Sequence, residues 1–432
     1  MVDAHRTFVI VGGGLAGAKA AETLRSEGFT GRVIIIGDEG DHPYERPPLS
    51  KGFLTGKEER DSVFVHEPAW YARHRVELHL GQTVTEIDRD TRCVHLGDGT
   101  SVRYDKLLLT TGSEPRRLDI PGTGLAGVHH LRRLAHADRL RQVLTTLGRD
   151  NGHLVIAGAG WIGLEVASAA RGYGTEVTVV EPHPTPLHQV IGPEIGQLFT
   201  ELHSEHGVRF HFGARLTEIV GQDGMVLSVR THDGEEHMAH AVLAAIGAAP
   251  RTGLAEAAGL DLVGREHGGG IAVDLGLRTS DPDIYAAGDV ASFPFSLPGT
   301  ELPTDRLRVE HWANALNGGP AAARSMLGRD ETYDRLPYFF SDQYDLGLEY
   351  SGWAPPGSYD QVVVRGDAGK REFIAFWLKD RRVLAGMNVN VWDVTGDIQR
   401  IIRSGARQDP DALADPAVPL ESFAPEPPAD RA

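Results

Sequence analysis

Two glycine-rich turns are the residues of this chain best suited to binding phosphate groups. Glycine lets the backbone turn tightly and approach a pyrophosphate closely, and the helix that follows offers free N–H groups and a positive dipole end. The turns occupy residues 12–17 (GGGLAG) and 158–163 (GAGWIG). The residues that we expect at the two phosphate sites are Gly12, Gly14, Leu15, Ala16 and Gly17 in the first turn, and Gly158, Gly160, Trp161, Ile162 and Gly163 in the second.

The elements around each turn are those that a dinucleotide site needs. An apolar strand precedes each turn, and a second β-branched strand follows and ends in an acid, Asp38 in the first unit and Glu181 in the second. Both acids lie roughly 20 residues beyond their turn, where a carboxylate can accept from a ribose hydroxyl. A single glycine pattern could be an ordinary turn that binds nothing, but here the whole arrangement recurs. Two dinucleotides in one enzyme suggest that electrons pass between them.

The acid of the second unit favours one nicotinamide cofactor. Glu181 would repel the 2′-phosphate of NADPH and accept from the free hydroxyl of NADH. A protonated His183 would weaken this preference.

Composition limits the partners. The formal net charge of −17 argues against nucleic acid or an anionic membrane as the main partner. No apolar run approaches the roughly 20 residues that span a bilayer. The first strand starts close to Met1, which leaves no room for a signal peptide, so we expect a cytoplasmic protein.

Cys93 is the only cysteine, so the chain cannot form an internal disulfide. It lies in an alternating strand ahead of a Gly-Asp-Gly turn, which indicates a structural thiol. A disulfide reductase mechanism is therefore not expected.

The order of patterns predicts an α/β protein with a discontinuous first domain. We expect residues 1–112 and 246–324 to form the first nucleotide-binding domain, with the chain returning to it at 243–247 and 283–290. Residues 113–245 would form the second, and residues 325–420 a smaller α/β domain. The proline-rich, acidic residues 421–432 predict a disordered tail.

Seven motifs together resemble one family. They are the first glycine turn, RPPLSK at 46–51, TGSEPR at 111–116, GAGWIGLE at 158–165, YAAGDV at 285–290, RVEHWANA at 308–315 and SDQY at 341–344. This set is similar to the FAD-dependent ferredoxin reductases of the putidaredoxin reductase and aromatic-dioxygenase reductase type. Rubredoxin reductase and apoptosis-inducing factor share much of it. The resemblance implies a glutathione-reductase-like fold, with two Rossmann-like domains and a small C-terminal α/β domain.

The resemblance also implies which residues hold the cofactors, FAD on the first unit and NAD on the second. Asp38 would bind the adenosine ribose, Val84 the adenine through its backbone, and Asp289 the ribityl chain. Gly247 would lie near the nicotinamide. The remaining expected FAD contacts are Arg46, Lys51, Thr111, Gly112, Arg132, Gly288 and Trp312.

Lys51 and Glu165 are the expected catalytic pair. The resemblance implies that Glu165 faces Lys51 beside the flavin, where a buried ion pair would keep the lysine charged. From the residues alone, a surface lysine and a glutamate favoured by a helix N-terminus remain open.

The implied activity is transfer of hydride from NADH to FAD and of single electrons onward to a small iron–sulfur ferredoxin, which serves a cytochrome P450 or ring-hydroxylating oxygenase. An NADH oxidase or diaphorase using oxygen or a quinone is an alternative, and so is a redox-sensing interaction protein like apoptosis-inducing factor. The oligomeric state is open between monomer and homodimer.

Two histidine pairs, His203-x-x-His206 and His237-x-x-His240, have helical spacing but no nearby cysteine or acid at ligand spacing, so we expect no metal site. The family pattern is broken at residues 338–340 (YFF), where tryptophans are common, and at His311.

Overall fold

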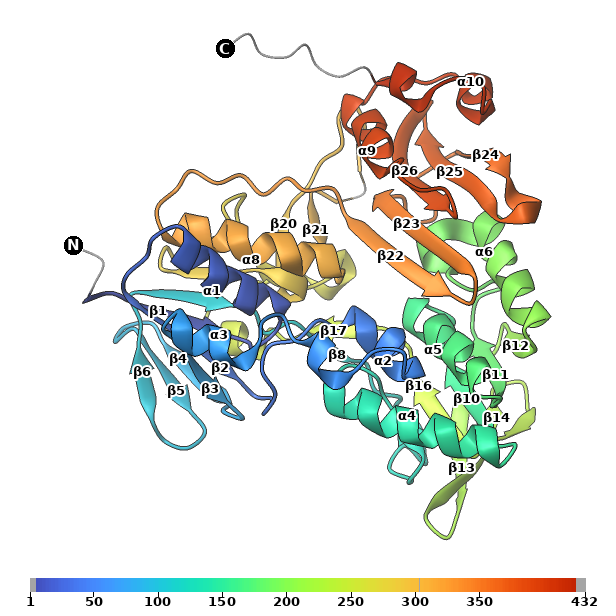
Figure 1. Ribbon diagram of the computed structural model, residues 1–432, viewed down its shortest axis with the longest axis horizontal. Coiled ribbons are helices and arrows are strands. Elements are labelled where there is room, and N and C mark those ends of the chain that lie inside the picture. The colour runs from blue at the N-terminus through green and yellow to red at the C-terminus, as the bar shows by residue number, and fades with distance from the viewer. Residues whose placement is uncertain (1–4, 303, 425–432) are drawn as a thin grey trace.

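The computed structural model describes residues 5–302 and 304–424 as three packed domains (Figure 1). The first contains a parallel five-stranded sheet in the order β19-β7-β1-β2-β3. Its strands are β1 (Thr7–Val11), β2 (Arg32–Gly37), β3 (Val76–Leu80), β7 (Lys106–Leu109) and β19 (Ile284–Ala286). Because β19 pairs with β7, residues after 283 complete a sheet that the N-terminal residues begin.

Helices α1 (Leu15–Ser26) and α8 (Trp312–Met326) lie side by side against this sheet (Figure 1). Their close approach requires glycine, because a Cβ on Gly319 would lie 2.2 Å from the carbonyl oxygen of Ala16. Residues from the two ends of the first domain therefore pack as one layer.

The second domain contains another parallel sheet, in the order β12-β11-β10-β16-β9. Its strands are β9 (Val128–His129), β10 (His153–Ala157), β11 (Glu176–Glu181), β12 (Val208–Phe212) and β16 (Ala241–Ala244), and its helices are α4 (Leu134–Arg149), α5 (Trp161–Gly172) and α6 (His188–Glu205). An antiparallel sheet of β13 (Leu216–Gln222), β14 (Met225–Thr231) and β15 (Glu236–Met238) adjoins it.

One expectation about the path of the chain is wrong. The apolar residues 243–247 were expected to lead back into the first domain, but β16 pairs with β10 in the second sheet. A short apolar run does not reveal which of two similar sheets it joins. The chain passes between the domains through β8 (Ser113–Pro115) and β17 (Ala248–Pro250), which pair with each other.

Smaller elements surround the first sheet. They are β4 (Val84–Asp88), β5 (Cys93–Leu96), β6 (Ser101–Arg103), β18 (Ile271–Ala272), β20 (Ala291–Pro294), β21 (Arg306–Arg308), α2 (Gly52–Thr55), α3 (Pro68–Arg73) and α7 (Gly253–Ala257). Within the described residues, no helix has the length and apolar character to cross a bilayer.

The C-terminal domain is an antiparallel sheet in the order β22-β23-β26-β25-β24, covered by two helices. Its elements are β22 (Tyr338–Gln343), β23 (Leu346–Gly352), β24 (Gln361–Asp367), β25 (Glu372–Lys379), β26 (Arg382–Val389), α9 (Thr395–Ser404) and α10 (Pro410–Ala414). The sheet buries a continuous apolar core that includes Trp377.

The predicted disordered tail is wrong for residues 421–424. The chain forms a 3₁₀ helix at Leu420–Phe423, and Leu420 and Ala424 are buried. Two apolar side chains that find a partner surface outweigh the proline-rich, acidic composition on which the prediction rested. Residues 425–432, the rest of that segment, lie outside the described residues.

Candidate functional site

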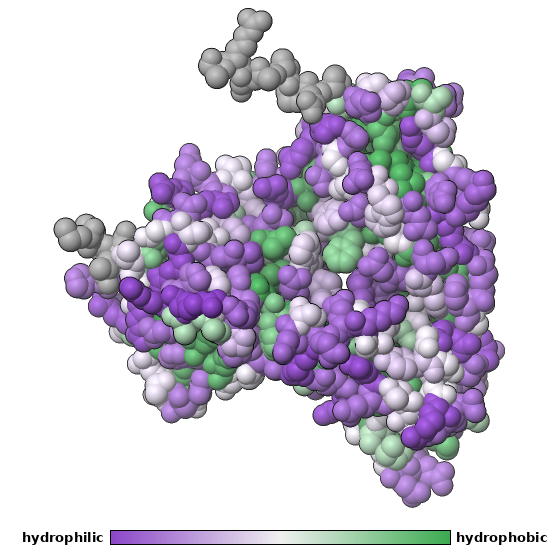
Figure 2. Space-filling model, in the orientation of Figure 1, coloured by the Kyte–Doolittle hydropathy of each residue, from purple (hydrophilic) through white to green (hydrophobic). Residues whose placement is uncertain are grey.

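One cavity of about 730 Å³ is lined by both glycine turns and by residues of all three domains. This volume lies within the usual range of ligand pockets. On the face shown in Figure 2 most of the surface is hydrophilic, and apolar residues show in the recess between the first and C-terminal domains. A ligand bound through one turn would therefore share the cavity with a ligand bound through the other.

The two turns have the same local geometry. Gly12 and Gly158 have φ angles of +124° and +99°, and a Cβ on either would lie within 2.5 Å of a backbone carbonyl oxygen. In contrast, a Cβ on Gly14 or Gly160 would meet nothing within 4 Å, and both residues line the cavity. The first glycine of each turn thus shapes the backbone, whereas the second leaves open the space that a pyrophosphate needs.

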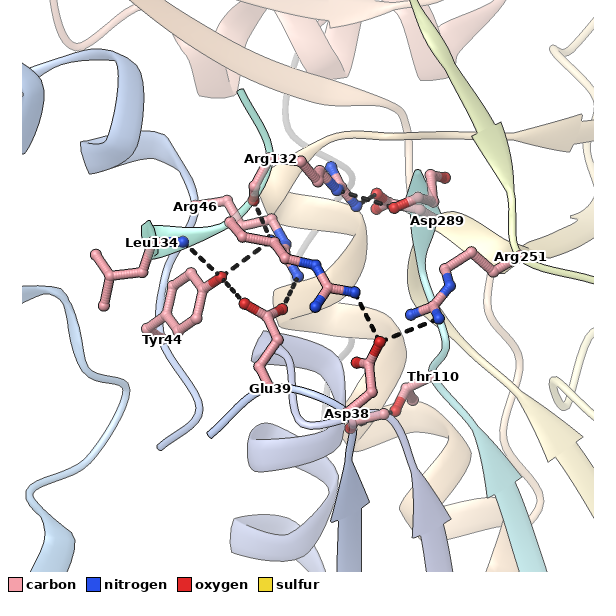
Figure 3. Close-up of polar contacts among 12 residues, drawn as sticks. Asp38, Glu39, Tyr44, Arg46, Thr110, Arg132, Leu134, Arg251 and Asp289 are labelled. Atoms are coloured by element: carbon pink, nitrogen blue, oxygen red, sulfur yellow. Dashed lines mark hydrogen bonds and ion pairs between the residues drawn. The ribbon is translucent and has the colours of Figure 1, made fainter. Parts of the chain in front are cut away.

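Arginines surround the acids of the first unit (Figure 3). Asp38, at the end of β2, accepts from Arg133 at 2.7 Å and from Arg251 at 3.1 Å. Burial raises the pKa of this carboxyl, but the two guanidinium charges outweigh it and hold the pKa below its usual value. Asp289 pairs with Arg132 at 2.6 Å. Each acid therefore lies beside cations that a phosphate could also engage.

Arg46 is held at the same wall of the cavity. Its guanidinium lies 3.3 Å from Glu39 Oε1 and donates to the carbonyl oxygen of Arg132. The Tyr44 hydroxyl donates to Glu39 and accepts from the N–H of Leu134 at 3.0 Å, which ties this loop to α4 (Figure 3). The proline-rich loop is thus fixed by polar contacts.

Lys51 and Glu165 meet inside the cavity, with Lys51 Nζ 2.7 Å from Glu165 Oε1. Lys51 is the N-cap of α2, and Glu165 comes from the first turns of α5. The same carboxylate accepts from the hydroxyls of Ser50 and Ser341. Glu165 therefore joins the first domain, the second domain and the C-terminal strand β22.

Aromatic side chains complete the wall near this pair. Lys51 Nζ lies 5.3 Å from the ring centroid of Phe340. Trp312 packs edge-on against Phe340 and donates from Nε1 to Glu45 at 3.1 Å. His311 packs against Phe339, and burial lowers the pKa of His311 to about 4, so it is neutral at pH 7. Of the residues that depart from the family pattern, His311, Phe339 and Phe340 thus line the cavity, whereas Tyr338 does not.

Five residues expected to bind cofactor do not line the cavity. Val84 is buried in β4, where it pairs with Leu96. Glu181 is buried and accepts from the backbone N–H groups of Ala159 at 2.7 Å and His183 at 3.0 Å, so it braces the second turn. The five residues are Gly17, Val84, Gly158, Gly163 and Glu181.

The remaining expected residues are brought together. Gly12, Gly14, Leu15, Ala16, Asp38, Arg46, Lys51, Thr111, Gly112, Arg132, Gly160, Trp161, Ile162, Glu165, Gly247, Gly288, Asp289 and Trp312 all line the one cavity. Three of its lining residues, Ser113, His136 and Trp161, bury a polar side-chain atom that has no protein partner. Buried polar atoms usually have a partner, so these fit a polar ligand. The donors, acids and open glycines therefore suit two dinucleotides.

Sequence reasoning missed several residues of the site. Ser341 was seen only as part of a motif, and nothing in the sequence tied it to Glu165. Burial raises the pKa of Asp342 in the same strand. Arg133 and Arg251 were also missed as partners of Asp38, although Arg133 directly follows an expected site residue.

Other expectations concern residues outside the cavity. Cys93 is partly buried in β5 and does not line the cavity. Because the chain has no second cysteine, Cys93 cannot form an internal disulfide. His203 is buried, and its ring nitrogen Nε2 lies 2.8 Å from Gln343 Oε1. His206 Nδ1 contacts the carbonyl oxygen of Leu202 at 2.8 Å, so both histidines are satisfied within the protein.

Two Rossmann-like units that open into one cavity, with an ion pair between them, define an oxidoreductase of the two-dinucleotide class. The chain belongs to the pyridine nucleotide-disulphide oxidoreductase family, whose model matches residues 6–319. A reductase C-terminal model matches residues 338–424. The resemblance and the fold class inferred from the motifs are thereby confirmed.

The chain is similar throughout its length to known reductases. It is 39% identical to the ferredoxin–NAD(+) reductase component of the anthranilate 1,2-dioxygenase system of Burkholderia cepacia, over 96% of this chain and 98% of that protein. It is 34% identical to putidaredoxin reductase of Pseudomonas putida, over 98% and 97%. The crystal structure of a ferredoxin reductase from Rhodopseudomonas palustris matches with a TM-score of 0.89 and 35% identity, covering 97% and 100%.

Proposed function

We propose that this protein is an NADH-dependent ferredoxin reductase that holds FAD on its first nucleotide-binding unit. The observation that carries the proposal is the Lys51–Glu165 pair at 2.7 Å, within a cavity lined by both glycine turns. FAD, when bound, would link a donor of two electrons, the hydride of NADH, to an acceptor of one electron at a time. The similar reductases of dioxygenase and putidaredoxin systems support this assignment.

The chain's own residues position the two cofactors. The open space at Gly14 and Gly160 admits one pyrophosphate at each turn, and Asp38 and Asp289 offer acceptors to hydroxyl groups. Lys51, held by Glu165, would place a positive charge beside the edge of a flavin ring bound in the cavity. Phe339, Phe340 and Trp312 exclude water from that wall of the cavity.

We assign NADH as the preferred donor. Glu181 places a buried carboxylate directly behind the second turn. Negative charge at the end of this strand disfavours a 2′-phosphate and favours a free ribose hydroxyl.

We assign a small iron–sulfur ferredoxin as the acceptor, serving a P450 or ring-hydroxylating oxygenase. One structure similar to this chain is a covalent complex of putidaredoxin reductase with putidaredoxin, with a TM-score of 0.89 and 34% identity. We further propose that the enzyme works in the cytoplasm, with access to NADH, as a monomer or homodimer.

The test is an anaerobic titration of the yellow, FAD-loaded protein with NADH, followed by addition of an oxidised [2Fe–2S] ferredoxin. Bleaching of the flavin absorbance by one equivalent of NADH, then its return as the ferredoxin is reduced, is the expected result. A protein that cannot be loaded with FAD, or whose flavin NADH does not bleach, contradicts the proposal. Turnover with oxygen or a quinone that exceeds turnover with every ferredoxin tested would favour an oxidase or diaphorase.

A further inference from the structure

A cluster of two histidines and two acids lies at the outer edge of the second domain, and none of its members lines the nucleotide cavity. His211 comes from the edge strand β12. The other three residues, Asp233, Glu235 and His237, lie at the turn between β14 and β15 and at the start of β15. Figure 1 shows β12 and β14 on the same side of the molecule.

Three side-chain atoms of the cluster converge. His211 Nδ1 lies 2.8 Å from His237 Nε2 and 3.4 Å from Glu235 Oε2. The distance between His237 Nε2 and Glu235 Oε2 is 3.8 Å. A point equidistant from three atoms at these separations lies about 2.0 Å from each, the length of a zinc–imidazole or zinc–carboxylate bond. The side chains therefore need little movement to coordinate one cation.

The fourth residue orients one of these ligands. Asp233 Oδ2 accepts from His211 Nε2 at 2.8 Å, and its other oxygen accepts from the hydroxyl of Thr231 at 2.5 Å. A carboxylate on the far nitrogen of a metal-binding histidine fixes its tautomer, so that the near nitrogen presents a lone pair to the metal. His211 is also mostly buried, with a side chain 15% exposed, which limits its freedom further.

We propose that His211, His237 and Glu235 form a binding site for a divalent transition-metal cation, with zinc as the cation that fits best. Two imidazoles and one carboxylate are a ligand set that zinc uses in tetrahedral sites with water at the fourth position. The cation would tie the β14–β15 turn to the edge strand β12, and so join the antiparallel sheet to the NAD-side parallel sheet. The site is separate from the reductase chemistry.

This proposal differs from the expectation drawn from the spacing of His237 and His240. His240 is not part of the cluster, because its Nδ1 accepts from the backbone N–H of His153 at 3.0 Å. The partner of His237 is instead His211, 26 residues away on another strand. The acid of the proposed site, Glu235, lies two residues before His237, on the turn between β14 and β15.

The experiment uses the full-length, FAD-loaded protein without a histidine tag, stripped with EDTA and then dialysed into metal-free buffer. Zinc chloride is added in a calorimetric titration, and retained zinc is measured by mass spectrometry after gel filtration. The parent protein should retain one zinc per chain, and X-ray absorption at the zinc edge should show two imidazole ligands at about 2.0 Å. Zinc should also raise the Tm of the parent protein.

Variants test which side chains bind the zinc. His211→Gln and His237→Gln should lose the retained zinc and the rise in Tm, whereas Asp233→Asn should weaken zinc binding about 10- to 100-fold. The matched control is His267→Gln, because His267 is an exposed histidine beside a single glutamate. All variants should keep the flavin spectrum and the NADH-dependent turnover, since the cluster is outside the cavity.

The proposal is overturned if the parent protein retains no zinc, or if His237→Gln retains as much as the parent. It is also overturned if the bound zinc lacks two imidazole ligands. Because the measurement on the parent protein decides by itself, a variant that loses flavin or misfolds leaves the test intact. Failure of zinc binding would not affect the proposed reductase activity, which is measured separately.

Discussion

Lys51 and Glu165 lie 114 residues apart in the chain, and their charged atoms are 2.7 Å apart in the structure. Their side chains are only 15% and 3% exposed. A buried charge that loses its partner is costly, so this contact favours one arrangement of the two nucleotide-binding units over others. The same contact places this ion pair in the cavity that both glycine turns line.

Replacing Glu165 by Gln should destabilise the protein and slow its reduction. Glutamine keeps hydrogen-bonding atoms near Ser50 and Ser341 but leaves Lys51 without its counter-charge. We expect a loss of about 3 kcal/mol in the free energy of unfolding, measured in urea, and slower flavin bleaching by NADH. Ser341→Ala removes the hydrogen bonds of this hydroxyl with Glu165 and Gln343 and should cost about 2 kcal/mol. Equal free energies of unfolding for Glu165→Gln and the parent would show that the ion pair does not stabilise the folded protein.

Alanine at the second glycine of each turn should weaken the binding of one cofactor and leave the other unaffected. A Cβ at Gly14 or Gly160 meets no protein atom within 4 Å, so both variants should fold. Gly14→Ala should weaken retention of FAD, because the new methyl group occupies the space of its pyrophosphate. Gly160→Ala should keep FAD and raise the KM for NADH.

These two outcomes are measured by flavin content after gel filtration and by steady-state kinetics. Each variant is the control for the other. If Gly14→Ala raises the KM for NADH while retaining FAD, the assignment of the two units is reversed.

Glu181→Gln should relax the preference for NADH. A unit charge contributes about 1 kcal/mol to an interaction at 4 Å in water and more near a protein surface, so we expect the ratio of kcat/KM for NADPH to NADH to rise about tenfold. The absolute value for NADH should fall as well, because the hydrogen bond to Ala159 weakens. An unchanged ratio would mean that Glu181 only braces the turn.

Stability should fall as the pH drops from about 6.5 to 4. Burial lowers the pKa of His203 to about 4, so the folded protein keeps it neutral while the unfolded chain already takes up a proton. In that window the unfolded state binds more protons, and each such histidine costs about 1.4 kcal/mol per pH unit. His129, His153 and His311 have similarly lowered pKa values.

His203→Gln removes one of these histidines. The free energy of unfolding should therefore fall less steeply with pH, by about 1.4 kcal/mol per pH unit. Urea unfolding at pH 7, 6 and 5 measures the slope for both proteins. A slope that is the same with and without His203 would contradict its burial as a neutral group.

Cys93→Ser should leave turnover with ferredoxin unchanged. The thiol lies in β5, away from the cavity, and its only described polar contact is with the carbonyl oxygen of Thr91 at 3.7 Å. A tenfold loss of kcat in steady-state assays would reveal a redox role that the structure gives no reason to expect.

The local patterns of the chain were sufficient to predict the elements around the two glycine turns. The strands around both turns and the helix after each follow from hydrophobic periodicity and glycine placement, which are local signals. The boundary at 243–247 and the packing of 421–424 were not predictable in this way, because each depends on which distant surface an apolar segment meets.

By itself, the sequence determined that two dinucleotide units exist, that their turns need glycine, and that no internal disulfide can form. Tertiary structure alone decided that Ser341 joins Glu165, that Glu181 braces its turn and that Val84 lies away from the cavity. It also decided that His211 meets His237. Backbone turns and strands are set by neighbouring residues, whereas these contacts join side chains from separate elements. Their positions depend on how whole sheets pack, which no local pattern encodes.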